Sequence, residues 1–206
     1  MTQRVRGFEW TKDFQNEKDE AKKLYKIADR KMASDWEAKL KKVEELDKIT
    51  LPTRSTGKSA GYDFMANQYV TVPSIWKQAT KFIYNKLFNM GAFVEEKIFQ
   101  PTLVPTGVKA YMPEDEFLAL YNRSSNPRKR FLLLANGVGI IDKDYYGNVD
   151  NDGHIMFQFI NFGISDVTIK PGDVIGQGIF QEFRKTDMDS ATGERTGGFG
   201  STDSEK

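Results

Sequence analysis

The sequence predicts a mainly β fold, a β-sandwich or jelly roll with two α-helical insertions. From Leu51 onward, short apolar runs alternate with clusters of glycine, proline, asparagine and aspartate, which is typical of short strands joined by tight turns. Two segments break this pattern with apolar residues at helical spacing. We therefore expect two helices added to an otherwise β-rich domain.

The part of the chain before Leu51 predicts a first strand and then one long helix. The segment "RVRGFEWT" at 4–11 is short and rich in large residues, so we expect it to be the first strand. In the charged segment 17–48, which has neither glycine nor proline, apolar residues recur every three or four positions. We expect this stripe to pack on its own domain, with a partner-binding coiled coil as the alternative. The stripe consists of Leu24, Ala28, Met32, Trp36, Leu40 and Val43.

The remaining chain predicts a second helix and a series of strands. Residues 75–90 carry apolar residues at helical spacing, after Ser74 as a suitable N-cap and before Gly91 as a suitable stop. The apolar runs expected to form strands are 69–72, 117–121, 131–135, 155–160, 167–169 and 174–180.

The two helical insertions flank the segment "SAGYDF" at 59–64, which suggests that they leave neighbouring points of the sandwich. We expect them to pack together as one helical subdomain, because pairing would bury the apolar stripes of both. The alternative is that either stripe is an exposed docking surface for a protein partner. The side chains expected to meet are Leu24, Trp36 and Leu40 with Trp76, Phe82 and Leu87.

Composition excludes several classes of protein and site. The 206 residues carry a formal charge of +1, which is not the basic footprint of a nucleic-acid binder. The chain has no cysteine, which excludes a disulfide scaffold and a cysteine nucleophile, and its single histidine is His154. No apolar run reaches the roughly 18 residues of a membrane helix, and the first residues lack the apolar core of a signal peptide. We expect a protein of the cytoplasm.

Polar residues cluster at five places around the predicted strands. Taken singly, each cluster is explained by a turn, a solvated loop, a sheet-edge amide or a tail, and 136–147 alone is best explained as a β-hairpin. Together they offer arginine and hydroxyl groups for phosphate oxygens, glycine-rich backbone for a polyphosphate and aromatic rings for a base. The clusters are "SAGYDF" at 59–64, "NRSSN" at 122–126, "NGVGIIDKDYYG" at 136–147, "GDVIGQGIF" at 172–180 and "ERTGGFGST" at 194–202.

In this order, the clusters resemble the five motifs of the homotrimeric dUTP diphosphatases, or dUTPases. Twelve residues from Ser124 to Asn136, and six from Asn136 to Asp142, match the spacing of bacterial members. The resemblance covers the first strand and most of 51–206. It implies a single dUTPase-like domain over 1–206 with a flexible glycine-rich arm at 194–206. The helical insertions lie outside the resemblance and are compatible with a phage or prophage member.

The resemblance implies hydrolysis of dUTP to dUMP and pyrophosphate, which clears dUTP from the nucleotide pool and supplies the precursor of dTMP. Asp142 would act as the general base that takes a proton from the attacking water. Tyr145 would lie under the deoxyribose and leave no space for a ribose 2′-hydroxyl. Asn136 and the backbone near Gly139 would read the uracil edge.

The resemblance also implies how the triphosphate is bound. Asp63 would hold water ligands of a Mg²⁺ ion that the phosphates themselves bind. Each site would use motifs from all three subunits, which implies a homotrimer. The residues expected to bind phosphate are Arg123, Ser124, Ser125 and Gln177. Those expected from the arm are Phe199, stacking on uracil, and Arg195, Ser201 and Thr202, reaching the terminal phosphates.

The sequence departs from the family pattern in two places. The arm is one residue shorter between Arg195 and Phe199 than the familiar "RGSGGFGST". The insertion "DNDG" at 150–153 lengthens the segment that would supply a second backbone contact to uracil, so that contact is not assigned. The same stretch resembles the start of a calcium loop, but Phe159 stands where the bidentate glutamate is required, which excludes this reading. His154 is interpreted as a turn residue.

Two alternatives to dUTP hydrolysis come from the same fold. A dCTP deaminase shares the "RSS" motif but uses a catalytic glutamate where this chain has Gln158, and an amide cannot shuttle that proton. A dUTPase-fold regulatory protein would act through its helical insertions, but the complete set of motifs speaks against a purely non-catalytic role.

Overall fold

The computed structural model describes residues 5–27, 33–88 and 99–193, which form eleven strands and three α-helices. In chain order these are β1 (Gly7–Trp10), α1 (Lys12–Ile27), α2 (Ala33–Asp47), β2 (Tyr62–Met65), β3 (Val70–Val72), α3 (Ile75–Leu87), β4 (Thr102–Pro105), β5 (Val108–Tyr111), β6 (Glu116–Asn122), β7 (Leu132–Leu134), β8 (Gly139–Ile141), β9 (Met156–Asn161), β10 (Val167–Ile169) and β11 (Val174–Glu182). A π-helical turn, Asn126–Arg130, follows β6, and a 3₁₀ turn, Lys143–Tyr145, follows β8.

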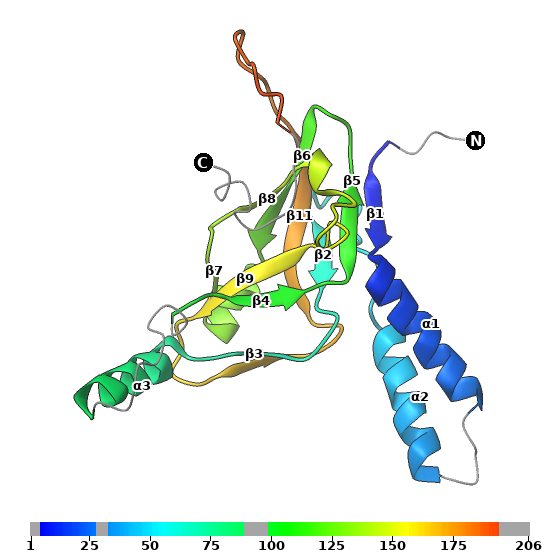
Figure 1. The fold of residues 1–206 in the computed structure, drawn as a ribbon, viewed down its shortest axis with the longest axis vertical. Coiled ribbons are helices and arrows are strands. Elements are labelled where there is room, and N and C mark those ends of the chain that lie inside the picture. Colours follow the sequence, from blue (N-terminus) through cyan, green and yellow to red (C-terminus); the bar gives the residue numbers. More distant parts are fainter. Residues whose placement is uncertain (1–4, 28–32, 89–98, 194–206) are drawn as a thin grey trace.

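The strands build the predicted sandwich (Figure 1). A four-stranded antiparallel sheet has the order β2-β11-β6-β8, and a three-stranded one has the order β4-β9-β7. The core lies between them: the rings of Phe64 in β2 and Phe157 in β9 are 5.6 Å apart between centroids, and both are fully buried. A Cβ at Gly176 in β11 would come within 2.1 Å of the Phe157 ring, which explains why this strand carries a glycine there.

The expected strands are present. β3, β6, β7, β9, β10 and β11 coincide with the six apolar runs, and β1 lies within 4–11 and pairs with β5. The pairs β1-β5 and β10-β3 form two further small sheets. The apolar runs do not reveal β2, β4 and β5, which are only four residues long and include polar residues such as Asp63, Thr102 and Lys109.

The expectation of a β-hairpin at 136–147 is wrong. β7 pairs with β9 in the three-stranded sheet, whereas β8 pairs with β6 in the four-stranded sheet. The glycine-rich stretch between them therefore carries the chain from one sheet to the other, with Gly137 in a left-handed conformation at φ 69°. Glycine and alternating apolar residues serve a hairpin and such a crossing equally well, so the local pattern does not distinguish them.

The prediction of one long helix over 17–48 is also wrong: the described residues form two helices, α1 and α2, that lie side by side (Figure 1). Ion pairs join Lys22 to Asp47 at 3.0 Å and Lys42 to Glu17 at 2.6 Å. The rings of Tyr25 and Trp36 also meet, 5.8 Å apart between centroids. A narrow apolar stripe is covered when the two halves of the segment pack on each other, so the spacing alone does not reveal the break. Ala28 and Met32 of the stripe lie outside the described residues.

The helix pair is anchored on the domain at its base. Phe14 of α1, Leu46 of α2 and Ile49 are buried in one cluster, against which Trp10 of β1 and Met65 of β2 pack. The insertion therefore rests on the domain through its base, but this cluster includes none of the residues of the predicted stripe, and Leu24 of the stripe is 41% exposed.

α3 begins where the sequence predicts, directly after Ser74. The Ser74 hydroxyl, however, donates to the backbone oxygen of Gly163 and does not cap the helix. Gly91, the expected stop, and Met90 lie outside the described residues.

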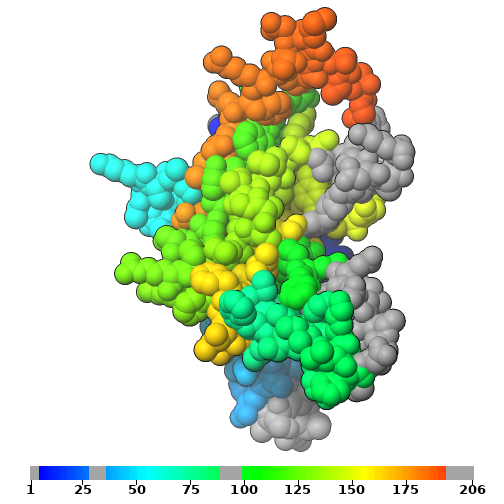
Figure 2. Space-filling model, turned by 90° about the vertical axis from the view of Figure 1, so that its left-hand side faces the viewer, coloured from blue at the N-terminus to red at the C-terminus, as the bar shows by residue number. Residues whose placement is uncertain are grey.

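The hypothesis that the two helical insertions pack together is wrong. Figure 1 places α3 on one side of the sandwich and the α1–α2 pair on the other. α1 follows β1, which pairs with β5, whereas α3 follows β3, which pairs with β10, so the helices leave different sheets. Trp76 and Leu87 of α3 are 59% and 74% exposed. Figure 2 shows α3 (blue-green to green) on the molecular surface.

Candidate functional site

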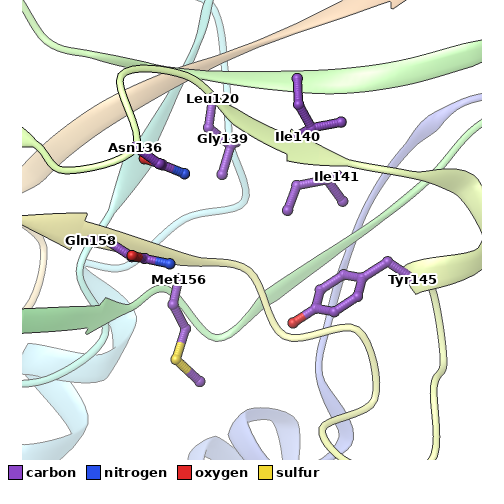
Figure 3. A pocket seen from close by; sticks show the side chains of 8 residues that line it. All are labelled: Leu120, Asn136, Gly139, Ile140, Ile141, Tyr145, Met156 and Gln158. Carbon is purple, nitrogen blue, oxygen red and sulfur yellow. The ribbon is translucent and has the colours of Figure 1, made fainter. Parts of the chain in front are cut away.

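A cavity of about 190 Å³ opens beside β8, at the margin between the two sheets (Figure 3). Its walls come from β6, β8 and β9, from the crossing before β8 and from the 3₁₀ turn after it. One wall is apolar, while amide groups of two side chains and a phenol provide polar atoms. The lining residues are Leu120, Asn136, Gly139, Ile140, Ile141, Tyr145, Met156 and Gln158.

Three of the residues predicted to bind the nucleoside lie on this cavity: Asn136, Gly139 and Tyr145. A Cβ on Gly139 would come within 3.2 Å of the Leu120 side chain and 3.3 Å of the Asn136 amide, so the glycine keeps space between them. Asp142, the predicted base, directly follows β8 and accepts a hydrogen bond from Tyr145 N at its backbone oxygen, at 3.2 Å. The chain thus places Asp142 and Tyr145 on the same short turn.

Tyr145 is fixed at the far end of its ring. Its hydroxyl donates to the backbone oxygen of His154 at 3.0 Å and accepts from Nδ2 of Asn151 at 2.8 Å. The next residue, Tyr146, donates to the Glu9 carboxylate at 2.6 Å, and this hydrogen bond raises the pKa of Tyr146 to about 12. Both tyrosines of the motif are therefore anchored to surrounding elements.

His154 has a structural role. Its Nε2 accepts a hydrogen bond from Gly107 N at 2.8 Å, which requires an unprotonated nitrogen. Burial lowers the pKa of His154, which favours this neutral form. The residue follows the turn that the sequence predicts, and it ties that turn to the loop before β5.

A second polar cluster lies on β2, β11 and the end of β6. Gln177 Nε2 donates to Asp63 Oδ1 at 2.8 Å, and the Ser55 hydroxyl donates to the other Asp63 oxygen. Arg123 comes directly after β6, followed by the exposed Ser124 and the half-buried Ser125. Of the predicted phosphate-binding residues, Gln177 thus lies in β11, whereas Arg123, Ser124 and Ser125 lie in the loop after β6, the strand that pairs with β11.

Sequence reasoning missed Asn126, which holds the Arg123–Ser125 loop in place. Its buried amide donates to Ile175 O of β11 at 2.7 Å and to Asn122 Oδ1 at 2.8 Å. Asn126 also caps the loop through its backbone N–H, which donates to Arg123 O at 2.9 Å. The sequence marks Asn126 only by its position, directly after the "RSS" motif and before Pro127.

The cavity and the Asp63–Gln177 pair lie on opposite faces of the four-stranded sheet. Leu120 of β6 faces the cavity, so Tyr121, the next residue of the strand, faces the other side. Gln177 is directly opposite both Tyr121 and Asp63 in the sheet, and residues directly opposite share a face. Within one chain, the cavity and the Asp63–Gln177 cluster are therefore separated by the sheet itself.

The predicted arm residues, Arg195, Phe199, Ser201 and Thr202, lie outside the described residues. Residues 183–193 before them are exposed throughout and project from the end of the sandwich near β6 and β11 (Figures 1 and 2).

In 5–27, 33–88 and 99–193 no group of three or more acidic or histidine side chains could hold a metal ion. Over the same ranges, no helix combines the length and apolar character needed to span a membrane.

Comparison with known proteins gives one consistent match. The family model described as dUTPase matches residues 92–203, more than half of the chain. The "Deoxyuridine 5'-triphosphate nucleotidohydrolase" of Lactococcus lactis is 44% identical over 156 residues, which are 75% of this chain and 88% of that protein. The protein of the same name from Rattus norvegicus is 30% identical over 181 residues, covering 85% of this chain and 72% of that protein. The crystal structure of a dUTPase from Streptococcus mutans has a TM-score of 0.58 at 32% identity, covering 88% of this chain and 98% of that chain.

Proposed function

This chain belongs to the dUTPase family, and from that premise we propose that it hydrolyses dUTP to dUMP and pyrophosphate. The observation that carries the proposal is the cavity beside β8, where Asn136, Gly139 and Tyr145 form the wall and Asp142 lies on the adjoining turn. An enzyme of this kind acts where nucleotides are made. The proposal therefore places the chain in the cytoplasm, or in that of the host if a phage encodes it.

In this proposal the cavity binds the nucleoside. The Asn136 amide and the backbone at Gly139 offer the donors and acceptors that read the edge of uracil. The Tyr145 ring closes the cavity under the deoxyribose. A buried aromatic wall discriminates by shape, because a ribose 2′-hydroxyl needs space that the ring already fills.

Asp142 is proposed as the general base. Hydrolysis of the bond between the α- and β-phosphates needs one water that is positioned and relieved of a proton as it attacks phosphorus. A carboxylate is suited to this because phosphoryl transfer depends chiefly on positioning and on neutralising charge. The proton passes from the water to a carboxylate oxygen of Asp142, and pyrophosphate leaves.

The second cluster is proposed to bind the triphosphate through Arg123, Ser124, Ser125 and Gln177. Asp63 fits a role in holding Mg²⁺ through water, because its two oxygens are oriented by Gln177 and Ser55 and a carboxylate has acceptor capacity beyond two such bonds. When bound, Mg²⁺ would offset the charge of the phosphate oxygens. The arm residues Arg195, Phe199, Ser201 and Thr202 are proposed to close over the substrate.

We infer that a complete site forms between copies of the chain in a homotrimer. The nucleoside cavity and the Asp63–Gln177 pair lie on opposite faces of one sheet, which argues against one chain presenting both to the same dUTP molecule. A second copy brings its phosphate cluster to the cavity of the first. The projecting residues 183–193 are placed to carry the arm away from its own sandwich toward a neighbour.

Neither alternative is favoured. Gln158 lines the cavity at the position where a dCTP deaminase uses its glutamate, and an amide does not exchange a proton in that way. A purely regulatory protein of this fold would have no need of the complete set of motifs.

The test is pyrophosphate release from dUTP, dCTP, dTTP and UTP in the presence of Mg²⁺. A strong preference for dUTP supports the proposal. Ammonia release from dCTP would overturn it in favour of deamination, and equal turnover of all four nucleotides would remove the assigned selectivity.

A further inference from the structure

We propose that Asn151 is a positioning residue of the nucleoside cavity. By holding the hydroxyl of Tyr145, it fixes where the tyrosine ring stands and so sets the preference for a 2′-deoxy sugar over a ribose. The inference rests on the proposed function, because it takes Tyr145 as the wall beneath the sugar. None of the five motifs reaches the loop 148–153 in which Asn151 lies.

The first step is the hydrogen bonding of Tyr145. The hydroxyl uses its proton toward His154 O and a lone pair toward Asn151 Nδ2. Tyr145 is 5% exposed, so water has little access to replace either bond. Since a hydroxyl at the far end of the ring is held from two sides, the ring cannot swing without breaking one of these bonds.

The second step is that the Asn151 amide has a single orientation that satisfies its neighbours. Its Oδ1 accepts from Gly153 N at 3.0 Å, from His154 N at 3.2 Å and from Asn148 Nδ2 at 2.8 Å. All three donors require an oxygen, so the amino group is the one that faces Tyr145. The side chain therefore acts as a fixed donor to the phenol.

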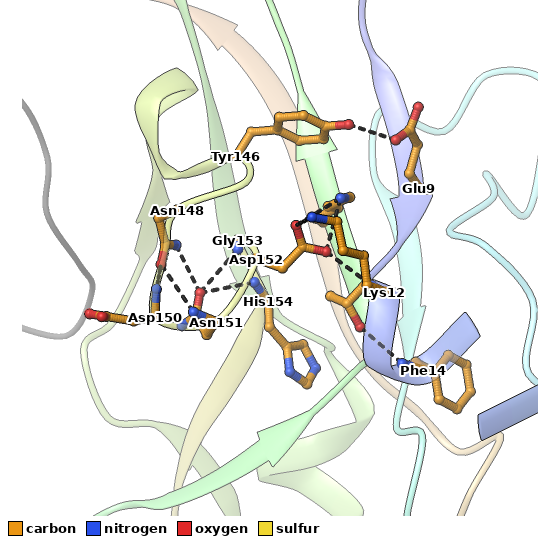
Figure 4. A network of polar contacts seen from close by, with 12 residues as sticks. Glu9, Lys12, Phe14, Tyr146, Asn148, Asp150, Asn151, Asp152, Gly153 and His154 are labelled. Atoms are coloured by element: carbon orange, nitrogen blue, oxygen red, sulfur yellow. Dashed lines mark hydrogen bonds and ion pairs between the residues drawn. The ribbon is translucent and has the colours of Figure 1, made fainter. Parts of the chain in front are cut away.

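The third step is that the loop itself is anchored by the next residue, Asp152 (Figure 4). Its carboxylate forms an ion pair with Lys109 of β5 at 2.9 Å and accepts from the backbone N of Lys12, the first residue of α1, at 2.9 Å. The Lys109 side chain is 9% exposed, which shields this pair from water. The backbone of Asp152 is left-handed, with φ 59°, so the chain turns sharply at this residue.

Through these contacts the loop connects Tyr145, in the wall of the cavity, to β5 and α1. A 2′-hydroxyl requires more room than a hydrogen atom, and a ring that can shift by a fraction of an ångström admits it. The donor on Asn151 opposes that shift. Its loss is expected to weaken discrimination against UTP and to leave the chemistry at Asp142 unaffected.

The test compares Asn151→Asp with the matched control Asp150→Asn. In Asn151→Asp one oxygen still serves Gly153 N and His154 N, but the other can only accept. The single proton of the Tyr145 hydroxyl then serves either this oxygen or His154 O, so one of the two bonds that hold the hydroxyl is lost. We expect the ratio of kcat/KM for dUTP to that for UTP to fall roughly two- to tenfold, as for loss of one hydrogen bond of ordinary strength. For dUTP, KM should change, whereas kcat should keep the wild-type value. Asp150 is exposed and points away from the loop in Figure 4, so its variant should keep the wild-type ratio.

A double-mutant cycle with Tyr145→Phe separates positioning from simple loss of structure. Tyr145→Phe removes the hydroxyl, so adding Asn151→Asp to it should change selectivity no further. An unchanged ratio in Asn151→Asp, or an equal effect in both backgrounds, would overturn the inference. Equal turnover of dUTP and UTP by the wild-type protein would instead overturn the proposed function, so the two failures are distinguishable.

Discussion

Asp142 stands between β8 and the 3₁₀ turn, so its backbone is fixed on both sides. Replacement by asparagine keeps the size of the side chain and removes its basicity. We expect Asp142→Asn to keep its fold and to bind dUTP, but to lose about 10² to 10⁴ in kcat, the contribution of a general base. Steady-state kinetics together with binding of a non-hydrolysable dUTP analogue measure the two properties separately.

The matched control is Asp144→Asn, which removes an exposed carboxylate from the same turn. It should retain near wild-type turnover. If Asp142→Asn hydrolyses dUTP as fast as the wild-type protein, Asp142 is not the base.

His154 predicts a pH dependence of stability. Because burial lowers its pKa in the folded protein, the unfolded chain binds the proton more readily. The stabilising effect of neutral His154 is therefore complete above the unfolded pKa of about 6.5 and is lost as the pH falls through the lower folded value. Thermal unfolding between pH 7 and pH 5, at about half-unit steps, should show a decline in Tm on the acid side.

The control for this prediction is His154→Gln, whose amide oxygen can accept the hydrogen bond from Gly107 N but does not titrate. The Tm of this variant should change less than that of the wild-type protein across the same pH range. An equally steep decline in both proteins would assign the effect to other groups.

Single residues differ in how far the sequence reveals them. The resemblance to the dUTPase motifs predicts Asp63, Asn136 and Tyr145 as site residues, because each stands at a position that a motif defines. No such motif position marks Asn126 or Asn151. A turn-rich sequence contains many asparagines, and only the fold shows that these two amides bond to Ile175 O and to the Tyr145 hydroxyl. Residues that position others leave little trace in a single sequence.

The sequence predicts a strand or helix where one of its faces is buried in the core. It does not predict which strands pair or which helices pack together. The apolar runs of β6, β9 and β11 reflect the core that they cover, so their positions follow from the pattern alone. The partner of β8 is a property of the assembled sheets, and the segment 136–147 carries no sign that β8 joins β6. The division into α1 and α2 was missed for a similar reason, since their packing on each other is a long-range contact.

The helix pair predicts a contrast between two leucines. Leu46 of α2 is 2% exposed in the cluster with Phe14 and Ile49, whereas Leu24 of α1 is 41% exposed. Leu46→Ala should lower the free energy of unfolding by about 2–5 kcal/mol, because it leaves a cavity in a packed cluster. Leu24→Ala should change it by less than about 0.5 kcal/mol. Chemical denaturation of both variants measures the difference.

Activity measured on the folded variants is the control for this contrast. Neither Leu46 nor Leu24 lines the nucleoside cavity, so both proteins should hydrolyse dUTP normally below their unfolding transitions. Equal destabilisation by the two changes would mean that the helix pair is not anchored through Leu46.

At the scale of the whole molecule, the arrangement of the sheet is the basis of the proposal that copies of the chain share a site. The four-stranded sheet carries Leu120 on the cavity face and Gln177 on the other. The sequence lists the motifs in order but cannot show that two of them face opposite directions. Alternation along β6 and the register with β11 reveal it, and this geometry underlies the proposed sharing of sites between subunits.

Subunit mixing tests that sharing directly. In the proposed homotrimer, Asp142→Asn damages the cavity side of a chain and Arg123→Ala damages its phosphate side, so each variant alone should be nearly inactive. In a closed ring, a site that combines the intact cavity of one variant with the intact phosphate cluster of the other is complete. Random mixing at equal amounts makes each site complete with a probability of one half times one half, so co-refolding should restore about a quarter of wild-type activity. If the mixture shows only the average of the two parent activities, both halves of the site come from the same chain, and the opposite faces of the sheet do not meet across a subunit boundary.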